Sequence, residues 1–253
     1  MRLEQAIFTS MRGPRLDGYQ LASQSSGISN QIAKELTAWG PAHDSLQATE
    51  PGTKSINFHG LSDDLFCISQ TSLAGSEYSG RGGGRVYTQM LVVPREALVR
   101  FAGDPLQVLQ AVSASGRLLV HETVPNSLPT IPLLGRGSEV GRNTSSDLIC
   151  AIGPETLAEL TEVLTSNWSL TVVTNLPISR LIQTVLQQLS LEERLQVSFT
   201  TALRPSSRRP FKLSFSPNDA AQARQSQRIS GGRIIEVIVE KSDLLVARPS
   251  ALV

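Results

Sequence analysis

The stretch SGRGGGRVYTQMLVVP, residues 79–94, places three consecutive glycines between Arg81 and Arg85. Successive amides in a glycine turn can form a small nest for an anion, and two guanidinium groups beside it would add positive charge. A P-loop needs a Gly-Lys-Ser/Thr ending and a following helix whose first amides face the phosphate. Here an apolar run typical of a buried strand follows instead. A plain turn and a small anion nest are the two interpretations, and a P-loop is excluded.

A second group of cations lies between residues 203 and 233, where seven basic side chains accompany a single acidic one, Asp219. One interpretation is a contact for an acidic protein surface or for phosphates. The other is a solvated edge whose arginines pair with the acidic segment around Glu155. The group lacks the interleaved aromatics of single-strand binders, so nucleic-acid binding is the weaker alternative. The basic residues are Arg204, Arg208, Arg209, Lys212, Arg224, Arg228 and Arg233.

The sequence contains no recognisable motif for catalysis or metal binding. The sequence contains neither a Gly-x-Ser-x-Gly elbow nor a Ser-x-x-Lys pair. His43, His59 and His121 are scattered, and none has a second ligand three or four residues away. Cys67 with His59 or His121 would make a thiol dyad if they met in space, but its apolar neighbours favour a buried structural cysteine. We therefore predict no catalytic, cofactor-binding or metal-ligating residue.

Composition sets the class of protein. The 253 residues suffice for one large or two modest domains, and 40% of them are hydrophobic. A net charge of +1 argues against a surface built wholly for nucleic acid or acidic lipid. The N-terminus lacks the apolar core of a secretion signal, and no apolar run approaches the roughly 20 residues that cross a bilayer. Two distant cysteines give no disulfide framework, so we expect a cytoplasmic protein.

The first half of the sequence predicts several short strands and two helices. An amphipathic helix is indicated at 28–39, because its apolar residues recur at helical spacing and Gly40-Pro41 follows. A second, short helix should start near Asp104-Pro105, after a strand or turn at its N-terminal side. Residues 121–146 are dense in Pro, Gly and Ser and are typical of a connector. Strands are predicted at 4–11, 18–27, 51–60, 64–74 and 85–94, the first two as a hairpin.

The second half predicts a β-α-β-α-β-β order, which usually forms a partly parallel sheet. Its strands are expected at 147–153, 170–174, 194–201, 210–215 and 233–240, and its helices at 154–168 and 178–189, with a further short helix at 218–229. We predict an α/β fold, with α+β as the alternative, in which mixed sheets pack against amphipathic helices. The predicted domains or subdomains are residues 1–145 and 146–253.

Three stretches together resemble motifs of one bacterial family. The first contains FTS and GYQ, the second runs from EYSGRGGG into a long apolar strand, and the third joins SFTT to RPF. They resemble the N-terminal region of bacterial GTPase-associated protein one. The motif residues are Phe8, Thr9, Ser10, Gly18, Tyr19, Gln20, Tyr78, Ser79, Gly80, Arg81, Gly84, Ser198, Phe199, Thr200, Thr201, Arg209, Pro210 and Phe211.

The resemblance implies partner binding and not turnover. Members of that family are predicted adaptors encoded beside small GTPases in bacterial conflict or signalling systems, and no catalytic residues are assigned to this region. The candidate partner-binding residues are Arg81, Arg85, Arg204, Arg208, Arg209 and Lys212. Many relatives continue beyond residue 253, so a stand-alone version and a shortened chain are both compatible, and GGGR at 82–85 departs from the more polar and aromatic approach expected there. A nucleotide-binding or enzymatic domain with an unfamiliar site is the alternative function.

Overall fold

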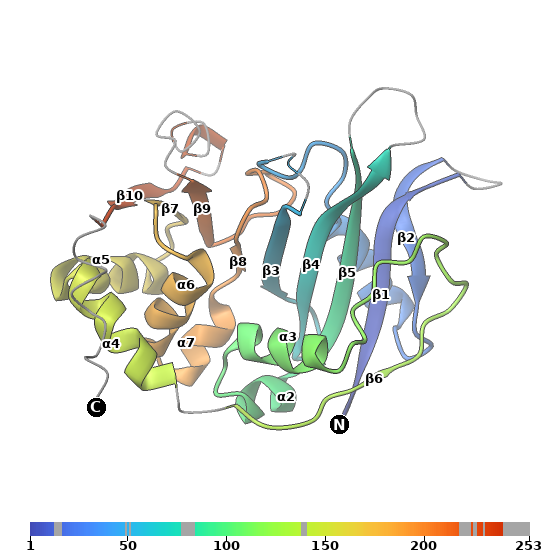
Figure 1. Ribbon diagram of the computed structural model, residues 1–253, viewed down its shortest axis with the longest axis horizontal. Coiled ribbons are helices and arrows are strands. Elements are labelled where there is room, and N and C mark those ends of the chain that lie inside the picture. Colours follow the sequence, from blue (N-terminus) through green and yellow to red (C-terminus); the bar gives the residue numbers. More distant parts are fainter. Residues whose placement is uncertain are drawn as a thin grey trace, which may run out of the picture.

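The computed structural model describes residues 1–12, 17–48, 50, 52–76, 84–137, 141–217, 224, 227–229 and 231–239. Within them, ten strands join in one mixed sheet in the order β10-β7-β9-β8-β3-β4-β5-β1-β2, with β6 paired to β1 (Figure 1). The α/β prediction is confirmed, with one continuous sheet. The strands are β1 (Arg2–Met11), β2 (Gly18–Gln24), β3 (Lys54–Gly60), β4 (Leu65–Ser76), β5 (Gly84–Pro94), β6 (Ile131–Pro132), β7 (Leu170–Thr174), β8 (Phe199–Thr200), β9 (Leu213–Pro217) and β10 (Arg233–Val237).

In the antiparallel half of the sheet, β3-β4-β5-β1-β2, strands β4, β5 and β1 carry buried side chains on both faces, and β2 at the edge is mostly half-buried. Along β5, Met90 and Val92 pack with helix α1 (Asn30–Trp39), whereas Leu91 and Val93 join the core on the opposite face. This follows from the two-residue period of a strand, which sends successive side chains to opposite sides. Ser29 caps α1 by accepting a hydrogen bond from the amide of Ile32. We call the face that α1 covers the α1 face.

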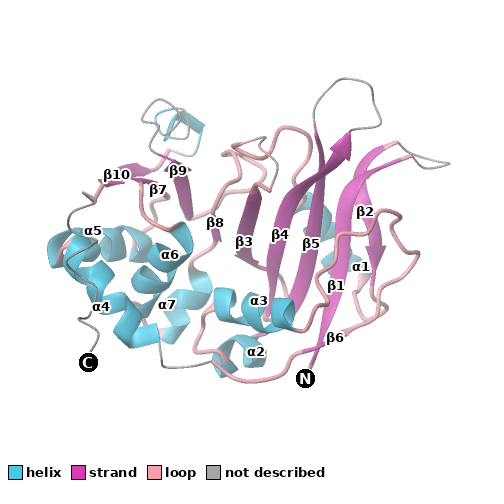
Figure 2. Cartoon of the chain, viewed as in Figure 1, coloured by secondary structure: helices cyan, strands magenta, loops and turns pink. Residues whose placement is uncertain are grey.

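The other face carries the principal core of the molecule. Buried residues of helices α2 to α7 pack there against the sheet in one continuous hydrophobic cluster (Figures 1 and 2). An ion pair between Arg95 and Glu192 joins the first of these helices to the last. The helices are α2 (Arg95–Arg100), α3 (Pro105–Ala114), α4 (Gly141–Ile152), α5 (Pro154–Thr165), α6 (Ile178–Gln187) and α7 (Leu191–Gln196).

The strands β10, β7, β9 and β8 are parallel, which confirms the partly parallel sheet predicted for the second half. Leu213 and Phe215 of β9 point into the principal core, so Ser214 and Ser216 face the other way, toward the α1 face. Helix α1 covers only the antiparallel strands. The parallel strands therefore direct Ser214 and Ser216 toward a part of the α1 face that α1 itself does not cover.

The two halves of the sheet meet at β8, which is two residues long. Phe199 and Thr200 pair with Phe58 and Asn57 of β3 on one side and with β9 on the other. Buried polar side chains reinforce the junction on the α1 face. Thr200 donates from Oγ1 to Asn57 Oδ1 at 2.6 Å, and the Asn57 amide donates to Ser69 Oγ at 3.1 Å. Since buried polar groups are costly without partners, this network fixes the register of the junction.

Most of the predicted elements are confirmed, with boundaries that differ by a few residues. The hairpin at the N-terminus, the helix at 30–39, the three strands of the first half and the helix starting at Pro105 all form. The same holds for α5, α6 and the strands β7, β9 and β10. The residues expected to form a short helix at 218–229 lie mostly outside the described part of the chain.

Three local predictions are wrong. Residues 147–152 form the second half of α4 and not a strand, because Leu148 and Ile152, four positions apart, pack together into the core, and Gly153 is the N-cap of α5. Such a short apolar run fits either state by pattern alone. Residues 95–100, expected as strand or turn, form helix α2. The predicted boundary at 145/146 falls within α4, and the division into two domains stays a prediction.

The third error concerns residues 194–201, where the alternation of apolar residues predicted a strand. Helix α7 runs to Gln196, and only Phe199 and Thr200 are in a strand. A capping box explains the difference: the Ser190 side chain accepts from the Glu193 amide, and the Glu193 carboxylate accepts from the Ser190 amide. This Ser-x-x-Glu signal outweighs the alternation that follows it.

Replacing Asn57 tests the junction. Asn57→Ala should lower the free energy of unfolding by about 1–3 kcal/mol, because it removes the buried acceptor of the Thr200 and Ser55 hydroxyls and the buried donor to Ser69 Oγ. Urea denaturation measures the change. Gln31→Ala is the control, since the Gln31 side chain is exposed and bonds only within α1, and it should change stability by no more than ~0.5 kcal/mol. Equal effects of the two substitutions would contradict the assigned role of Asn57.

Candidate functional site

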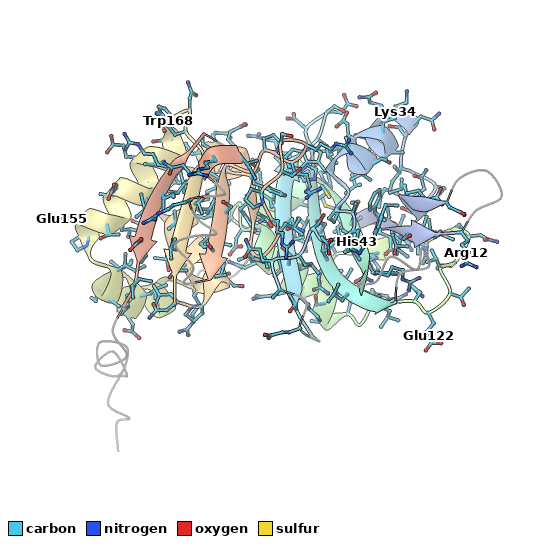
Figure 3. The ribbon with its side chains drawn as sticks, turned by 90° about the horizontal axis from the view of Figure 1, so that it is seen from above. Arg12, Lys34, His43, Glu122, Glu155 and Trp168 are labelled. Atoms are coloured by element: carbon cyan, nitrogen blue, oxygen red, sulfur yellow. The ribbon has the colours of Figure 1, made fainter. Side chains whose placement is uncertain are left out.

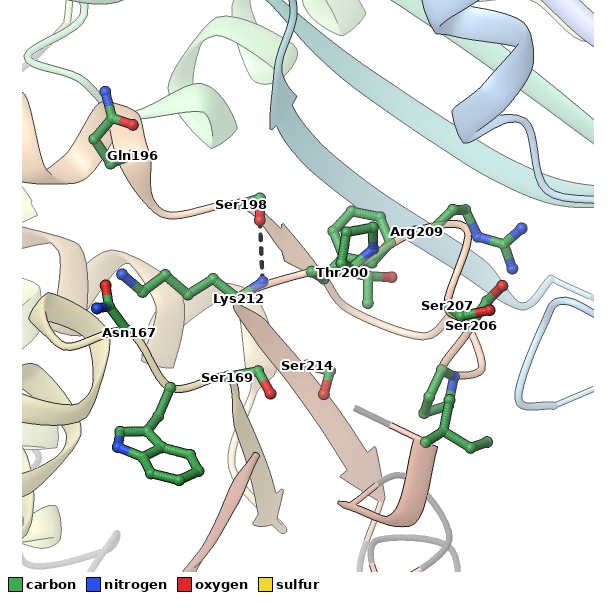
Figure 4. Close-up of a pocket in the computed structure, with 15 residues that line it drawn as sticks. Asn167, Ser169, Gln196, Ser198, Thr200, Ser206, Ser207, Arg209, Lys212 and Ser214 are labelled. Atoms are coloured by element: carbon green, nitrogen blue, oxygen red, sulfur yellow. Dashed lines mark hydrogen bonds between the residues drawn. The ribbon is translucent and has the colours of Figure 1, made fainter. Parts of the chain in front are cut away.

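A recess of about 480 Å³ opens on the α1 face of the parallel strands (Figure 4). Its floor is polar and comes from the residues at and just before the first positions of β7, β8 and β9. Its ionisable side chains, among the described residues, are two cations, Arg209 and Lys212. The lining residues are Asn167, Trp168, Ser169, Gln196, Ser198, Thr200, Pro205, Ser206, Ser207, Arg209, Pro210, Phe211, Lys212, Ser214 and Ile229.

Lys212 reaches across one end of this recess. Its backbone amide donates to Ser198 Oγ at 3.0 Å, which fixes the start of β9. Its side chain extends toward Asn167, with Gln196 on the same side (Figure 4). Partial burial lowers the pKa of the Lys212 ammonium. Lys212 forms no ion pair with any residue that the structure describes. The ammonium is thus partly desolvated and uncompensated.

Arg209 points the other way and serves the fold. Its side chain is 8% exposed. The guanidinium donates to Ser45 Oγ at 3.3 Å and to the Gly40 carbonyl at 3.5 Å, so it ties the loop between β8 and β9 to the end of α1. The Nε atom is buried without a partner in the described structure, and burial lowers the pKa of the group. Arg209 is therefore placed to anchor the wall of the recess.

The remaining cations of the 203–233 group are exposed. Arg204 and Arg208 lie on the loop between β8 and β9, and Arg224, Arg228 and Arg233 are exposed as well. None of them forms an ion pair within the described ranges, so the predicted pairing with the glutamates around Glu155 of α5 is not observed there. These side chains remain available to solvent.

The two arginines of the glycine stretch have different positions. Arg81 lies outside the described residues. Arg85 lies near the start of β5, where it is 8% exposed and donates from Nε to the carbonyl of Ala74 at 3.0 Å. The apolar strand expected after the glycines is confirmed as β5. Because Arg85 is buried and bonded to β4, its observed role is to stabilise the pairing of β4 with β5.

An aromatic stack continues the wall of the recess into the antiparallel half. Phe211 meets Trp39 of α1 edge-on at 5.1 Å between ring centroids, and Trp39 stacks on His59 of β3 at 4.0 Å. His59 is 3% exposed, and burial lowers its pKa from 6.5 to about 4. At neutral pH the imidazole is uncharged and acts as a flat aromatic surface. The loop of the recess is thus packed onto α1 by rings as well as by Arg209.

The sequence suggested Cys67 and His59 as a possible thiol dyad. The two residues are neighbours in the sheet, but their pKa values are not those of a reactive pair. His59 lies directly opposite Cys67 in the antiparallel pairing of β3 and β4. Cys67 is completely buried, and desolvation raises the pKa of its thiol to about 12, while the pKa of His59 is about 4. A reactive pair needs a thiolate stabilised by an imidazolium, which is the reverse of these shifts. Both groups stay neutral, as the structural interpretation of Cys67 predicts.

The described residues offer little other candidate chemistry. No group of three or more histidine, cysteine or acidic side chains is arranged among them to hold a metal ion. His43 pairs with its neighbour Asp44 at 2.7 Å, and the backbone amide of His121 donates to Tyr87 Oη. Within the described residues, none of the helices is both long and apolar enough to cross a bilayer.

Sequence reasoning identified Lys212 but missed Asn167, Trp168 and Gln196. Trp168 is 53% exposed at the edge of the recess, although it follows α5 where an apolar residue would be expected to face the core. A weak signal was present, because the polar pair Ser166-Asn167 ends the helix and leaves the tryptophan in a loop. Strand order decides on which side of the sheet the loop containing Trp168 lies, and the sequence did not predict the strand order.

Comparison with protein families identifies the first half of the chain. The profile of GTPase-associated protein 1, N-terminal domain type 2, matches residues 2–134, which is more than half of the chain. The chain belongs to this family. The match contains β1 to β6 and α1 to α3, and it includes the first two motifs on which the resemblance rested. The resemblance is confirmed, and the third motif, at 198–211, lies beyond the match. No curated protein gives a significant match.

The role of Arg209 is testable against its neighbour. Arg209→Ala should lower the free energy of unfolding by about 1–3 kcal/mol, because the loop loses its buried contacts to Gly40 and Ser45. Arg208→Ala removes an exposed side chain and should stay within ~0.5 kcal/mol of the parent. Urea titrations of both variants supply the comparison. A neutral Arg209→Ala variant would show that this arginine does not anchor the loop.

The burial of His59 predicts a pH-dependent stability. Its pKa is about 4 in the folded chain and near 6.5 when exposed, so the unfolded state binds the proton first. The associated stability is complete above about pH 6.5 and is lost as the pH falls to about 4, a loss on the order of 3 kcal/mol.

Chemical denaturation at several pH values measures this loss. His59→Gln cannot take up the proton and should show a flatter profile between those two pH values. The nearby Glu35 has a lowered pKa, chiefly from a hydrogen bond with Ser62, and is present in both proteins. Profiles of equal slope for parent and variant would rule out His59 as the source.

Proposed function

We propose that this protein is a non-enzymatic adaptor or scaffold that binds a small GTPase, in a bacterial signalling or conflict system. The observation that carries the proposal is the family match over residues 2–134, because this family is named for its association with a GTPase. The GTPase would be one encoded nearby. The finer role, that of an adaptor joining this GTPase to other components, is our inference.

The chemistry of the matched half supports a scaffold. Its one cysteine, Cys67, is buried beside a histidine that stays neutral, and the polar side chains around Asn57 bond to one another. Buried polar groups that satisfy each other rigidify a fold and offer nothing to a substrate. A rigid sheet that presents loops to a partner suits an adaptor.

The alternative is nucleotide binding in the recess of the second half. A volume of about 480 Å³, an exposed Trp168 for a base and Lys212 for a phosphate favour it. Against it, ligands of parallel α/β sheets bind beyond the carboxyl ends of the strands, whereas this recess lies at the opposite ends of β7 and β9. Nucleic-acid binding through exposed Arg204 and Arg208 is weaker still, because Arg209 is engaged within the fold.

We propose that the protein is cytoplasmic. Cys67 and Cys150 are both free thiols, and Cys150 is exposed on α4. An exposed free thiol persists most readily in a reducing compartment.

Co-purification tests the proposed function. The purified chain should retain a small GTPase encoded beside it, and more of it in one nucleotide state, since GTPases rearrange their switch regions between states. Immobilised protein is incubated with the GTPase loaded with GDP or with a non-hydrolysable GTP analogue, and the bound fraction is quantified. Absence of retention in both states would refute the proposal. A melting-temperature rise with free nucleotide alone would favour the nucleotide-binding alternative.

A further inference from the structure

The proposed function leaves open which surface meets the partner. The family match covers the antiparallel half, whereas the residues that line the recess, 167–229, all lie outside it. Two properties distinguish the recess from the rest of the described surface. It contains an uncompensated, partly desolvated cation, and it has a large aromatic side chain exposed at its edge.

The polar end of the recess combines one ammonium group with two side-chain amides. The Lys212 ammonium extends toward the Asn167 amide, and Gln196 lies on the same side (Figure 4). None of these three side chains has a hydrogen bond or ion pair with a described residue. A carboxylate placed among them would accept charge-assisted hydrogen bonds and neutralise the ammonium.

The backbone around the recess decides between a carboxylate and a phosphate. Helices α5 and α7 both end beside the recess, at Thr165 and Gln196, so these two described helix termini present carbonyl groups to it. Phosphate sites typically use the amides of a helix N-terminus. Side-chain donors alone then hold the anion, and one ammonium with two amides suits a single carboxylate better than a chain of phosphates.

Trp168 and the loop cations extend this site into a surface large enough for a protein. Trp168 is 53% exposed. Tryptophan is enriched among the residues that dominate binding energy at interfaces. Arg204 and Arg208 are exposed on the loop that forms the opposite wall, and Arg209 and Phe211 hold that loop against α1. The cations are therefore presented from a fixed platform, which reduces the entropy lost on binding.

We propose that this recess is the docking site for an acidic segment of the protein partner, with a Glu or Asp carboxylate bound by Lys212 and Asn167 and an apolar side chain of the segment packed on Trp168. The proposal rests on the proposed function in taking the partner to be the small GTPase. The positive charge of Lys212, Arg204 and Arg208 without described counter-ions selects an acidic segment over a basic one.

Binding measurements on four variants test the site. Lys212→Glu reverses the charge at the polar end, and Trp168→Ala removes the exposed ring. Lys34→Glu is the matched control, because Lys34 is an exposed lysine of α1 at the other end of the molecule from Trp168 (Figure 3). Leu134→Ala is the apolar control, at 72% exposed. Lys212→Gln replaces Lys212→Glu if the latter fails to fold, as judged by circular dichroism and thermal melting.

Two ligands are used with each variant. The first is the GTPase in the nucleotide state that binds better. The second is a fluorescein-labelled peptide with three glutamates on each side of one central leucine, and its binding is followed by fluorescence anisotropy. A peptide with lysines in place of glutamates is the charge control. We expect Lys212→Glu and Trp168→Ala each to weaken both interactions by ~10-fold or more, and the two control variants to change them by less than ~2-fold.

The outcomes separate the two proposals. If the parent protein binds the GTPase and Lys212→Glu and Trp168→Ala bind it equally well, the docking site is refuted and the proposed function stands. If the GTPase does not bind but the acidic peptide does, in a manner that depends on Lys212 and Trp168, the proposed function fails and the site stands with another acidic partner. Peptide binding that Lys34→Glu weakens as much as Lys212→Glu would show general charge attraction and would overturn the site.

Discussion

The pairing of β3 with β8 is the constraint on which the rest of the structure depends. Two residues of β8, Phe199 and Thr200, connect an antiparallel sheet to a parallel one, and they do so with opposite chemistry on the two faces. Phe199 packs on Phe58 at 5.7 Å between ring centroids within the principal core, whereas Thr200 bonds to Asn57 on the α1 face. A shift of one residue would exchange these faces, so the polar network and the core fix the same register.

The recess is a consequence of this junction. Because the sheet continues through β8, the helices α2 to α7 form one layer on the core face, and α1 is left to cover the antiparallel strands on the other. The parallel strands then continue the sheet beyond β3, but α1 does not cover them. Their loop is drawn onto α1 by Arg209, Phe211 and Trp39, and the space that remains contains the Lys212 ammonium. A parallel sheet is ordinarily covered on both faces, which is compatible with the docking site that we propose here.

The two halves of the protein differ in how their ionisable side chains are compensated. In the half that the family profile matches, burial keeps His59 and Cys67 neutral, and the polar groups around Asn57 are satisfied internally. In the other half, Lys212 is partly desolvated without a described carboxylate beside it, and Arg204 and Arg208 are exposed on the loop that precedes it. A scaffold and a charged contact surface within one sheet fit the adaptor that we propose.

The sequence by itself determined the elements whose signals are local. Periodicity and caps located α1, α5 and α6, the turn residues bounded the first strands, and the motifs indicated the family. It misassigned residues 147–153 and 194–201, because short apolar runs are ambiguous and a capping box was overlooked. Tertiary structure alone decided that Arg209 is buried as an anchor and that Lys212 lines the recess, although they are three residues apart in one basic loop. Whether a cation is buried or presented depends on which strand neighbours it and which helix lies above, and strand order is a property of the whole chain and not of any local pattern.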